Sequence, residues 1–402
     1  MFAARSRRAV AAALAVVLVL AACSSGSTSL PTITPVVAPT TLLTRLGNDT
    51  IAVEQYTRTA THMDGVLVSR SPSTRVSRYS VAIGPNGAPT RVDFSARSGD
   101  GMAIPNELQS LSVRYSADTV YLVGHRSNGD TTRSLVVRGP VLPYTNNSYA
   151  LYELAFARLL ASGRDSAEFA LVPLNIAVRT STPLAVKLLG ADSARINFFG
   201  FPLYARRDAH GRIIALDGTK TTVKVRVERV PTADLDALAR DWQARELAGA
   251  PLGPASTRDT VRAAIGAAHV WIDYGRPALR GRDVWQNGIL GDTLWRTGAN
   301  AATQLHSDAD LVIGGATVPA GTYSLWTATT PSGYQLVINK QFGQWGTDHD
   351  PKRDLVRVPL REGTAATPAD RFTIELQPQA GSSSQLALTW GTKQLSVPVA
   401  PR

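Results

Sequence analysis

Short runs in which apolar and polar residues alternate recur along this 402-residue sequence, and they are clearest after residue 320. The run Tyr323 to Thr327 is separated by the turn Pro331-Ser332-Gly333 from the run Tyr334 to Ile338. Further runs follow at Phe372 to Leu376, Leu386 to Trp390 and Leu395 to Val399. Successive strand residues face opposite sides, so this spacing predicts an antiparallel β-sandwich or barrel. Pro398 predicts that the last strand is an edge, because proline cannot donate to a ladder.

The region from residue 45 to 230 also contains many short alternating runs. We expect strands at Val76–Ile83, Ser112–Val123, Ser134–Val137 and Thr221–Val230, with turns at Gly84–Gly87, Ser127–Asp130 and Asp208–Gly211. One helix interrupts them: Ser148 is a suitable N-cap, the following residues form an apolar face, and Gly163 can end it. The whole chain is therefore expected to be mostly β, with a curved antiparallel sheet and a few helices in this first domain.

The apolar run Phe199 to Tyr204 allows two interpretations. It is either a core strand, or the lining of a lipid-sized groove in the curved sheet. A curved sheet with a helix across it is similar, at the level of pattern, to the half-barrel of periplasmic lipoprotein carriers. A continuous apolar groove would favour that comparison, whereas a filled core would not.

Residues 231–267 are expected to be a helical linker between two domains. Thr232 is the expected N-cap of a helix from Ala233 to Leu247, with Leu235, Leu238 and Trp242 on one face. The Gly- and Pro-rich stretch 249–254 then breaks the pattern, and a second short helix is expected from Arg258 to Ile265. The second domain is expected to span residues 268–400.

The first 22 residues have the form of a secretory signal segment. Arg5, Arg7 and Arg8 precede the apolar run Ala9–Leu20, which is too short for a permanent membrane span. The tetrapeptide Leu20-Ala21-Ala22-Cys23 resembles a bacterial lipobox, in which cleavage precedes the cysteine and its thiol is acylated. Cys23 is the only cysteine of the chain, so it cannot form an internal disulfide, which favours lipidation.

Residues 23–44 are rich in Ser, Thr and Pro, and they are expected to be a tether from the membrane to the folded part. Serines directly after the cysteine, by resemblance to other lipoproteins, favour the outer membrane, with the protein facing the periplasm.

The formal charge of +11 falls to +8 once the three arginines of the signal segment are removed. Basic residues are scattered and the protein is expected to be exported, so nucleic acid is not an expected partner.

Several motifs lie in a fixed order in the second domain. They are Ile272 to Pro277, Gly281-Arg282, Trp295 to Thr303, Pro319 to Leu325 and Gly343-Gln344-Trp345-Gly346. Their order and spacing resemble a bacterial family known as domain of unknown function 2911. The resemblance covers about 130 residues and implies no established activity.

Polar and aromatic residues in or near these motifs are the candidate ligand-binding residues. They are Tyr274, Arg276, Arg282, Trp295, Arg296, Asn300, Lys340 and Trp345. Arginine forks match carboxylate or phosphate, and aromatic faces stack on sugars or cations, so a cluster around a pocket would bind an anion or a glycan. The alternative is structural: Arg296 would satisfy loop carbonyls, Asn300 would hold a turn, and the tryptophans would be core.

Enzyme motifs such as HExxH, GxSxG, a P-loop and a placed GxGxxG do not occur in the sequence. The nearest metal-like groups are 348–350 with Asp354, and 306–310, and neither has a recognised ligand spacing. We therefore expect no metal or cofactor and assign no catalytic residue.

The expected function is a non-catalytic binding or structural module of the envelope with an anionic, glycan or lipid ligand. The alternatives are a lipid or lipoprotein carrier, and an enzyme acting on envelope glycans or peptides through Arg276, Arg296 and Asn300.

Overall fold

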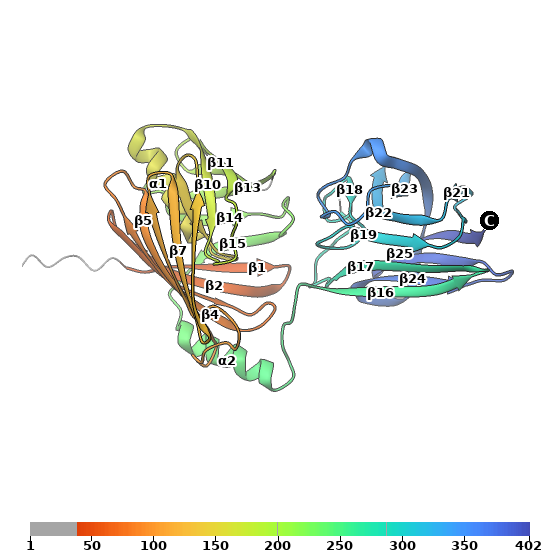
Figure 1. Cartoon of the computed structure of the whole chain (residues 1–402), viewed down its shortest axis with the longest axis horizontal. Helices are drawn as coiled ribbons and strands as arrows, with labels where there is room; N and C mark the ends of the chain where they lie inside the picture. The colour runs from red at the N-terminus through yellow and green to blue at the C-terminus, as the bar shows by residue number, and fades with distance from the viewer. Residues whose placement is uncertain (1–37, 199, 287) are drawn as a thin grey trace, which may run out of the picture. The chain divides into compact units, whose positions relative to one another are not determined.

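The computed structural model describes residues 38–402 except Phe199 and Asn287, so the expected signal segment, Cys23 and most of the tether lie outside the described residues. Two sheets make up this part of the chain, one of 15 strands and one of 10 strands (Figure 1). Almost all strand pairs are antiparallel, and no barrel is closed among the described residues. The expectation of a mostly β, sandwich-like protein is confirmed.

The first sheet contains β1 to β15. Their bounds are β1 Thr40–Leu46, β2 Asp49–Arg58, β3 His62–Ser69, β4 Arg75–Ile83, β5 Pro89–Ser98, β6 Ser110–Ser116, β7 Thr119–Arg126, β8 Gly129–Val136, β9 Val141–Tyr144, β10 Ser166–Pro173, β11 Thr182–Leu189, β12 Ser193–Phe198, β13 Phe201–Arg207, β14 Ile213–Asp217 and β15 Val225–Val230. Strands that follow one another in sequence pair, except β8 and β9, and β1 pairs with β15. Two meanders, β1 to β8 and β9 to β15, thus join into one sheet with β8 and β9 at its opposite edges. Only β9 and β10 run parallel within this set of described strands.

The expected tether and two expected strands need correction. β1 starts at Thr40, inside the expected tether, because Leu42 and Leu46 alternate into the core while the backbone pairs with β2 and β15. The expected strand Ser112–Val123 is two strands, β6 and β7, joined by a tight turn in which Ala117 has φ 50°. The expected strand Thr221–Val230 begins only at Val225, because residues before it form a turn.

The core of the first sheet is filled by side chains from strands and from one helical segment. η1 (Ala150–Tyr152) leads into α1 (Glu153–Ser162), which ends at Gly163 with φ 65°, as expected. The helical residues Leu151, Leu154, Phe156 and Leu159 belong to the same buried cluster as inward-facing residues of the strands. From the run Phe199 to Tyr204, proposed as a groove lining, Leu203 is also buried in this cluster, with an exposed fraction of 1%, whereas Tyr204 is 43% exposed and Phe199 lies outside the described residues.

Ser148 does not cap this helix, contrary to expectation. Neither η1 nor α1 has a side-chain cap from its own chain segment. Instead, the buried carboxylate of Glu54 on β2 accepts the amides of Tyr149 at 2.9 Å and Ala150 at 3.0 Å, and the hydroxyl of Ser148 donates to it. The backbone donors at a helix start need an acceptor, and here a neighbouring strand supplies it.

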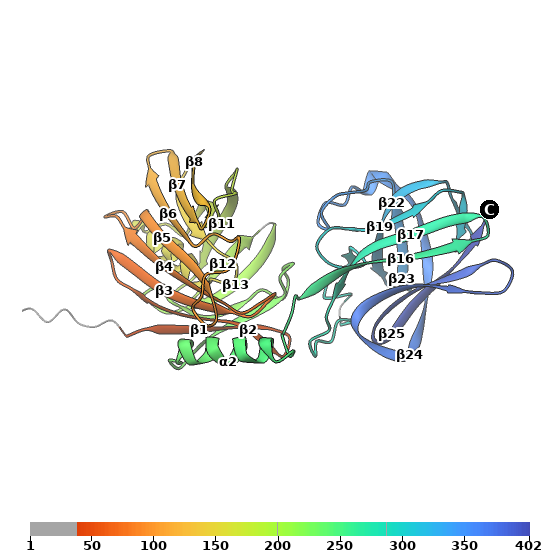
Figure 2. The same cartoon turned by 60° about the horizontal axis from the view of Figure 1, so that its bottom comes forward.

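α2 (Leu235–Leu247) covers the other face of the first strands (Figure 2). Leu235, Leu238 and Trp242 do form its packed face, against Val53, Val68 and Val76 of β2 to β4 among others. The cap is Asp234 rather than the expected Thr232, and its side chain accepts the Ala237 amide at 2.9 Å. Asp234 has extended φ and ψ one residue before the helix, which is the geometry that a capping carboxylate requires.

The second sheet contains β16 to β25. Their bounds are β16 Ser256–Ile265, β17 Ala268–Pro277, β18 Leu294–Trp295, β19 Thr303–Ser307, β20 Leu311–Ile313, β21 Ala316–Val318, β22 Gly321–Thr330, β23 Gly333–Asn339, β24 Asp354–Pro378 and β25 Ser384–Pro401, with η2 at Pro351–Arg353. The order is β16-β17-β19-β22-β23-β24-β25-β20-β21, and β18 pairs with β22. The core is aromatic, with Trp295 stacked on Trp390 at 5.6 Å and edge-on to Phe372 at 4.8 Å.

Two expectations for this region are wrong. Arg258–Ile265 is not a helix but most of β16, which pairs with β17 along its whole length through a tight turn at Gly266. Pro398 does not mark an edge, since β25 lies between β24 and β20. Pairing with β24 ends at Ser396 and pairing with β20 starts at Val399, so Pro398 sits where the strand changes partner and its missing N–H is not needed.

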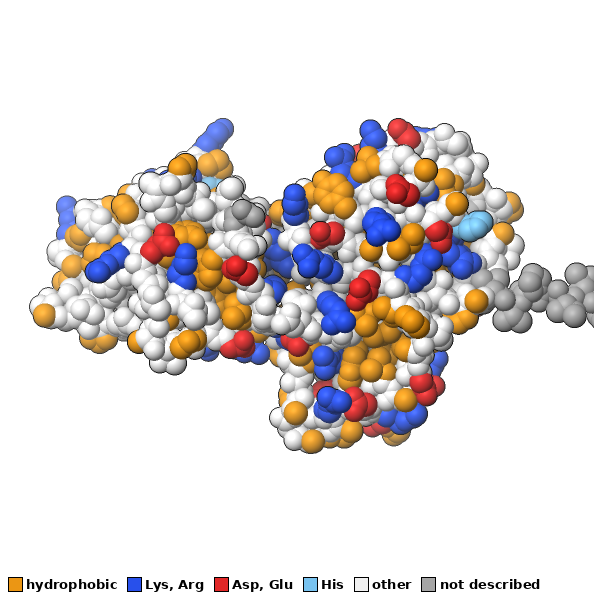
Figure 3. Space-filling view, turned by 180° about the vertical axis from the view of Figure 1, so that it is seen from behind, with side chains coloured by type: hydrophobic (Ala, Val, Ile, Leu, Met, Phe, Trp, Pro, Cys, Tyr) orange, Lys and Arg blue, Asp and Glu red, His pale blue; other side chains and the backbone are white. Residues whose placement is uncertain are grey.

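The surface mixes both signs of charge. On the face drawn in Figure 3, lysine and arginine side chains lie among aspartates and glutamates and do not form one continuous basic area. None of the described helices has the length and apolar character to cross a membrane.

Candidate ligand-binding site

Three of the candidate residues, Arg282, Arg296 and Asn300, line one cavity of about 590 Å³. Arg282 follows the end of β17, while Arg296 and Asn300 belong to the turn after β18. Positive φ angles at Thr297 (49°) and Asn300 (65°) shape that turn. Asn300 itself is exposed, and its carbonyl accepts the Gly346 amide at 2.9 Å, so it holds the turn, as the structural alternative proposed, and borders the cavity as well.

Arg282 is fixed by its own chain segment. Its Nε donates to the Leu279 carbonyl at 2.9 Å and its Nη2 donates to the Ala278 carbonyl. The guanidinium also lies 5.9 Å from the centre of the Trp390 ring. Burial, together with the neighbouring charge of Arg280, lowers the pKa of Arg282 to about 10.

Arg296 differs, because its guanidinium has no hydrogen bond or ion pair with any described residue. Its Nε is buried and has no partner, and burial lowers its pKa while Asp292 acts in the opposite direction. The stem of the side chain packs over Gly346, where an added Cβ would overlap Arg296 Cδ. The expectation that Arg296 satisfies loop carbonyls is therefore not met within the described part of the chain.

A third cation, Lys224, lines the same cavity. Its side chain is 10% exposed, and its Nζ donates to the Leu290 carbonyl at 2.9 Å and to Asp292 at 3.1 Å. Burial lowers the pKa of Lys224, the pair with Asp292 raises it, and the charges of Arg296 and Arg282 lower it further. Nothing in the sequence singles out Lys224, because it stands alone in a turn before β15, far from the family-like motifs.

Three other candidates are structural rather than cavity residues. Tyr274 is 2% exposed, and its hydroxyl accepts the Ile374 amide at 3.0 Å. Trp295 is part of the aromatic core. Arg276 joins β17 to β24 and β16, since it donates to the Phe372 carbonyl at 3.2 Å, to Thr373 at 3.1 Å and to Asp259 at 3.0 Å.

Lys340 and Trp345 lie on the segment between β23 and η2 and do not line the cavity of Arg296. Trp345 is 54% exposed and Phe342, which sequence reasoning missed, is 61% exposed. The segment is held by backbone bonds to the turn of Asn300, with the Ala302 amide donating to Gln344 at 3.2 Å. Two exposed aromatic rings on one loop are a second place where a ligand or a surface could be contacted.

The metal-like groups form pairs rather than metal clusters. His349 bonds to Asp354 at 2.8 Å, and the same carboxylate accepts from Asn339 and Arg357. In the other group, His306 bonds to Thr322 at 2.9 Å. The described residues contain no group of three His, Cys, Asp or Glu side chains arranged to hold a metal ion.

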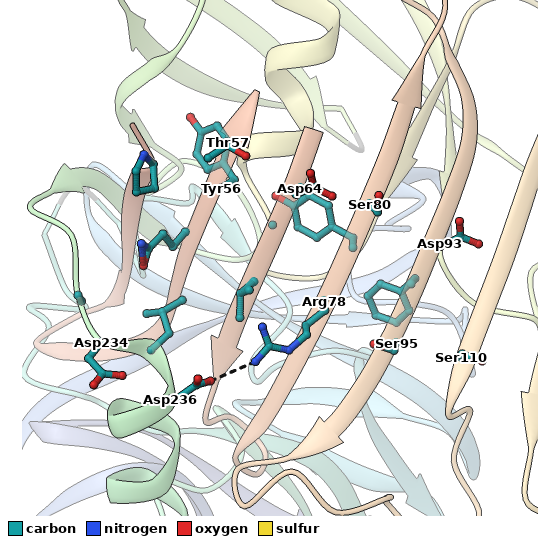
Figure 4. A pocket seen from close by; sticks show the side chains of 18 residues that line it. Tyr56, Thr57, Asp64, Arg78, Ser80, Asp93, Ser95, Ser110, Asp234 and Asp236 are labelled. Atoms are coloured by element: carbon teal, nitrogen blue, oxygen red, sulfur yellow. Dashed lines mark hydrogen bonds and ion pairs between the residues drawn. The ribbon is translucent and has the colours of Figure 1, made fainter. Parts of the chain in front are cut away.

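A larger hollow of about 720 Å³ lies on the outer face of β2 to β5, beside the start of α2 (Figure 4). Its charged side chains are already paired: Arg78 with Asp236 at 3.1 Å, and Asp93 with Arg91 at 2.7 Å. Asp234 is the cap of α2. Among its described lining residues, no buried side-chain nitrogen or oxygen lacks a partner, which distinguishes this hollow from the cavity of Arg296.

One comparison with known protein families agrees with the motif order in the second sheet. The model of a family described as "Protein of unknown function (DUF2911)" matches residues 256–399. A crystal structure of a DUF1089 family protein from Pseudomonas aeruginosa is similar, with 14% identity, a TM-score of 0.33, and coverage of 42% of this chain and 90% of that chain. No curated protein matches the sequence. The region from β16 to β25 thus corresponds to the DUF2911 family, as its motifs indicated.

Proposed function

We propose that this protein is a lipid-anchored binding protein of the bacterial cell envelope, without catalytic activity. The observation that carries the binding role is the cavity bordered by Arg282, Arg296 and Asn300, in which the guanidinium of Arg296, with its Nε buried, has no partner among the described residues. Buried polar groups are normally satisfied, so one that is oriented by packing and left unpaired is suited to a ligand. The ligand of this proposal is a small polar molecule.

The anchoring part of the proposal rests on the sequence around Cys23. Acylation of that cysteine would attach the mature chain to the outer membrane on its periplasmic side, because each buried methylene contributes about 0.8 kcal/mol and a multiply acylated residue stays bound. The tether before Thr40 then separates the folded part from the lipid surface. The domain arrangement proposed with it is a first domain up to Val230, α2 as a connection, and a DUF2911-like second domain.

The carrier alternative receives less support than the binding module. A carrier of lipids would need an open apolar groove, whereas Phe198, Leu203 and the residues of α1 pack together in one buried cluster. The enzyme alternative named Arg276, Arg296 and Asn300 around a pocket, and Arg276 instead holds strands together.

Cell fractionation with a Cys23→Ser variant tests the anchoring. The wild-type protein should partition into the detergent phase of a Triton X-114 extraction and incorporate labelled palmitate, while Cys23→Ser should do neither. A Ser24→Ala variant is the matched control and should behave as wild type. If Cys23→Ser partitions like wild type, the protein is not anchored through this residue.

A further inference from the structure

We infer that the cavity bordered by Lys224, Arg282 and Arg296 binds the phosphate or carboxylate group of a small molecule. This inference rests on the proposed binding function and narrows it to anionic ligands. It adds Lys224, which lies outside the region matched by the DUF2911 model.

The first step of the argument is the charge balance of the cavity. Three cationic side chains, Lys224, Arg282 and Arg296, line the cavity. Asp292 is the acid beside them: it pairs with Lys224, and its charge also acts on Arg296. At neutral pH their formal charges leave an excess of two positive charges. Like charges in a partly desolvated site repel one another, and the shielding that bulk water gives at the surface is reduced there.

The second step is that the three cations are not equally engaged. Lys224 donates hydrogen bonds to the Leu290 carbonyl and to Asp292, and Arg282 donates to the Leu279 carbonyl. These bonds orient both side chains. Arg296 donates no hydrogen bond to a described residue, and the aliphatic stem of its side chain is held by packing over Gly346. A guanidinium that is positioned but unpaired presents its fork of N–H donors, which matches two oxygens of a carboxylate or phosphate.

The third step compares the ligand classes. A neutral glycan would satisfy hydrogen bonds but would leave the excess charge uncompensated. An aliphatic lipid tail would leave the guanidinium unsatisfied and remove its remaining water, which is costly. An anionic group compensates the charge and accepts from Arg296 at once. Its volume of about 590 Å³ lets the cavity take a molecule larger than the anionic group alone.

The test is a melting-temperature titration of the full mature protein, extracted in detergent, at constant ionic strength set with sodium chloride. The probes are inorganic phosphate, succinate and neutral glucose. We expect phosphate, succinate or both to raise the melting temperature saturably, and glucose to have no effect. A stronger response to phosphate would assign a phosphate ester, and a stronger response to succinate a carboxylate.

The variants are Arg296→Met, Arg296→Lys and Lys224→Met, with Lys340→Met as the control that removes one exposed cation outside the cavity. Arg296→Met and Lys224→Met should weaken the response to the anion at least about tenfold, which corresponds to about 1.4 kcal/mol. Arg296→Lys should keep a weakened response, because a point charge replaces the fork. Lys340→Met should respond as wild type, and Arg296→Met should melt no lower than wild type without anion.

Equal responses of wild type and Arg296→Met would overturn the inference, and so would stabilisation by glucose alone or no response to any probe. If Arg296→Met fails to fold, Arg296→Lys decides, since a complete loss of the response in a folded Arg296→Lys variant contradicts a charge-based site.

Native mass spectrometry of the same preparation separates the anion site from the proposed binding function. A retained neutral molecule together with no anion response would refute the anion site and leave the binding function standing, whereas no retained molecule and no response would refute both.

Discussion

At the scale of single residues, Arg276 and Arg296 show why identical side chains in neighbouring motifs have different roles. Arg276 has three protein partners, and Arg296 has none among the described residues. The sequence offers both as candidate anion ligands, because composition and spacing cannot show which arginine finds carbonyls in the fold. Lys224 could not be predicted, since its proximity to Arg296 arises only when distant parts of the chain meet.

Replacing these two arginines by methionine should therefore have opposite effects on stability. Arg276→Met leaves the Phe372 carbonyl and Thr373 without their donor, and it should lower the free energy of unfolding by about 2 kcal/mol. Arg296→Met removes an unpaired, desolvated charge and keeps the stem, so stability should stay the same or rise. Urea denaturation of both variants measures this difference. A loss of 2 kcal/mol or more in Arg296→Met would mean that its guanidinium has a structural role.

Glu153 of α1 should give the protein a pH-dependent stability. It is fully buried, accepts from Tyr56, from Arg58 at 3.1 Å and from the Ile213 amide at 2.6 Å, and burial raises its pKa to about 7 despite the opposing charge of Arg58. Between pH 4.5, the ordinary pKa of a glutamate, and about pH 7, the folded protein therefore binds one more proton than the unfolded chain. The stabilisation associated with it is complete below the lower value and is lost as pH rises through the upper one.

The matched comparison is Glu153→Gln, which cannot ionise. Burial also raises the pKa of Glu54, but this residue is present in both proteins and its contribution cancels in the difference. Between pH 4.5 and 7.5, the unfolding free energy of wild type should fall relative to Glu153→Gln by on the order of 2–3 kcal/mol. Parallel stability curves for the two proteins over this range would contradict the assignment.

At the scale of elements, local patterns predicted most strands and the course of both helices. Gly163 ends α1 and the face of α2 packs as its spacing indicated, because these features depend on residues close in sequence. Helix starts were less predictable, since Glu54 from another strand supplies the acceptor that Ser148 was expected to provide. β16 was missed because its run Val261, Ala263 and Ile265 is short, and only pairing with β17 shows that it is a strand.

The packing of α2 on the outer face of the first sheet can be tested with Trp242. Its ring is 7% exposed, packs with Val53, Val68 and Val76, and lies 4.8 Å from the guanidinium carbon of Arg70. Trp242→Ala should lower the unfolding free energy by about 3 kcal/mol. The control is Leu247→Ala in the last turn, which is 77% exposed and should change stability by less than about 0.5 kcal/mol. Equal effects would show that α2 is not packed through Trp242.

At the scale of the whole molecule, each sheet has its own large buried cluster, and the alternation of apolar residues was sufficient to predict that the chain is mostly β. The motif order predicted the DUF2911 correspondence of the second sheet. The topology of the first sheet could not be predicted, because the pairing of β1 with β15 joins residues far apart in sequence. The cavity could not be predicted from the sequence either, because the segments that line it are far apart in the chain and share no local pattern.

The most direct test of a ligand-binding function is native mass spectrometry of the mature protein released from membranes in detergent. The account predicts that wild type and Lys340→Met retain the same small molecule, that its mass and fragmentation reveal a phosphate or carboxylate, and that Arg296→Met loses it. A wild-type protein that carries no small molecule, or an Arg296→Met variant that retains the same molecule equally well, would contradict the assignment of this cavity as the binding site.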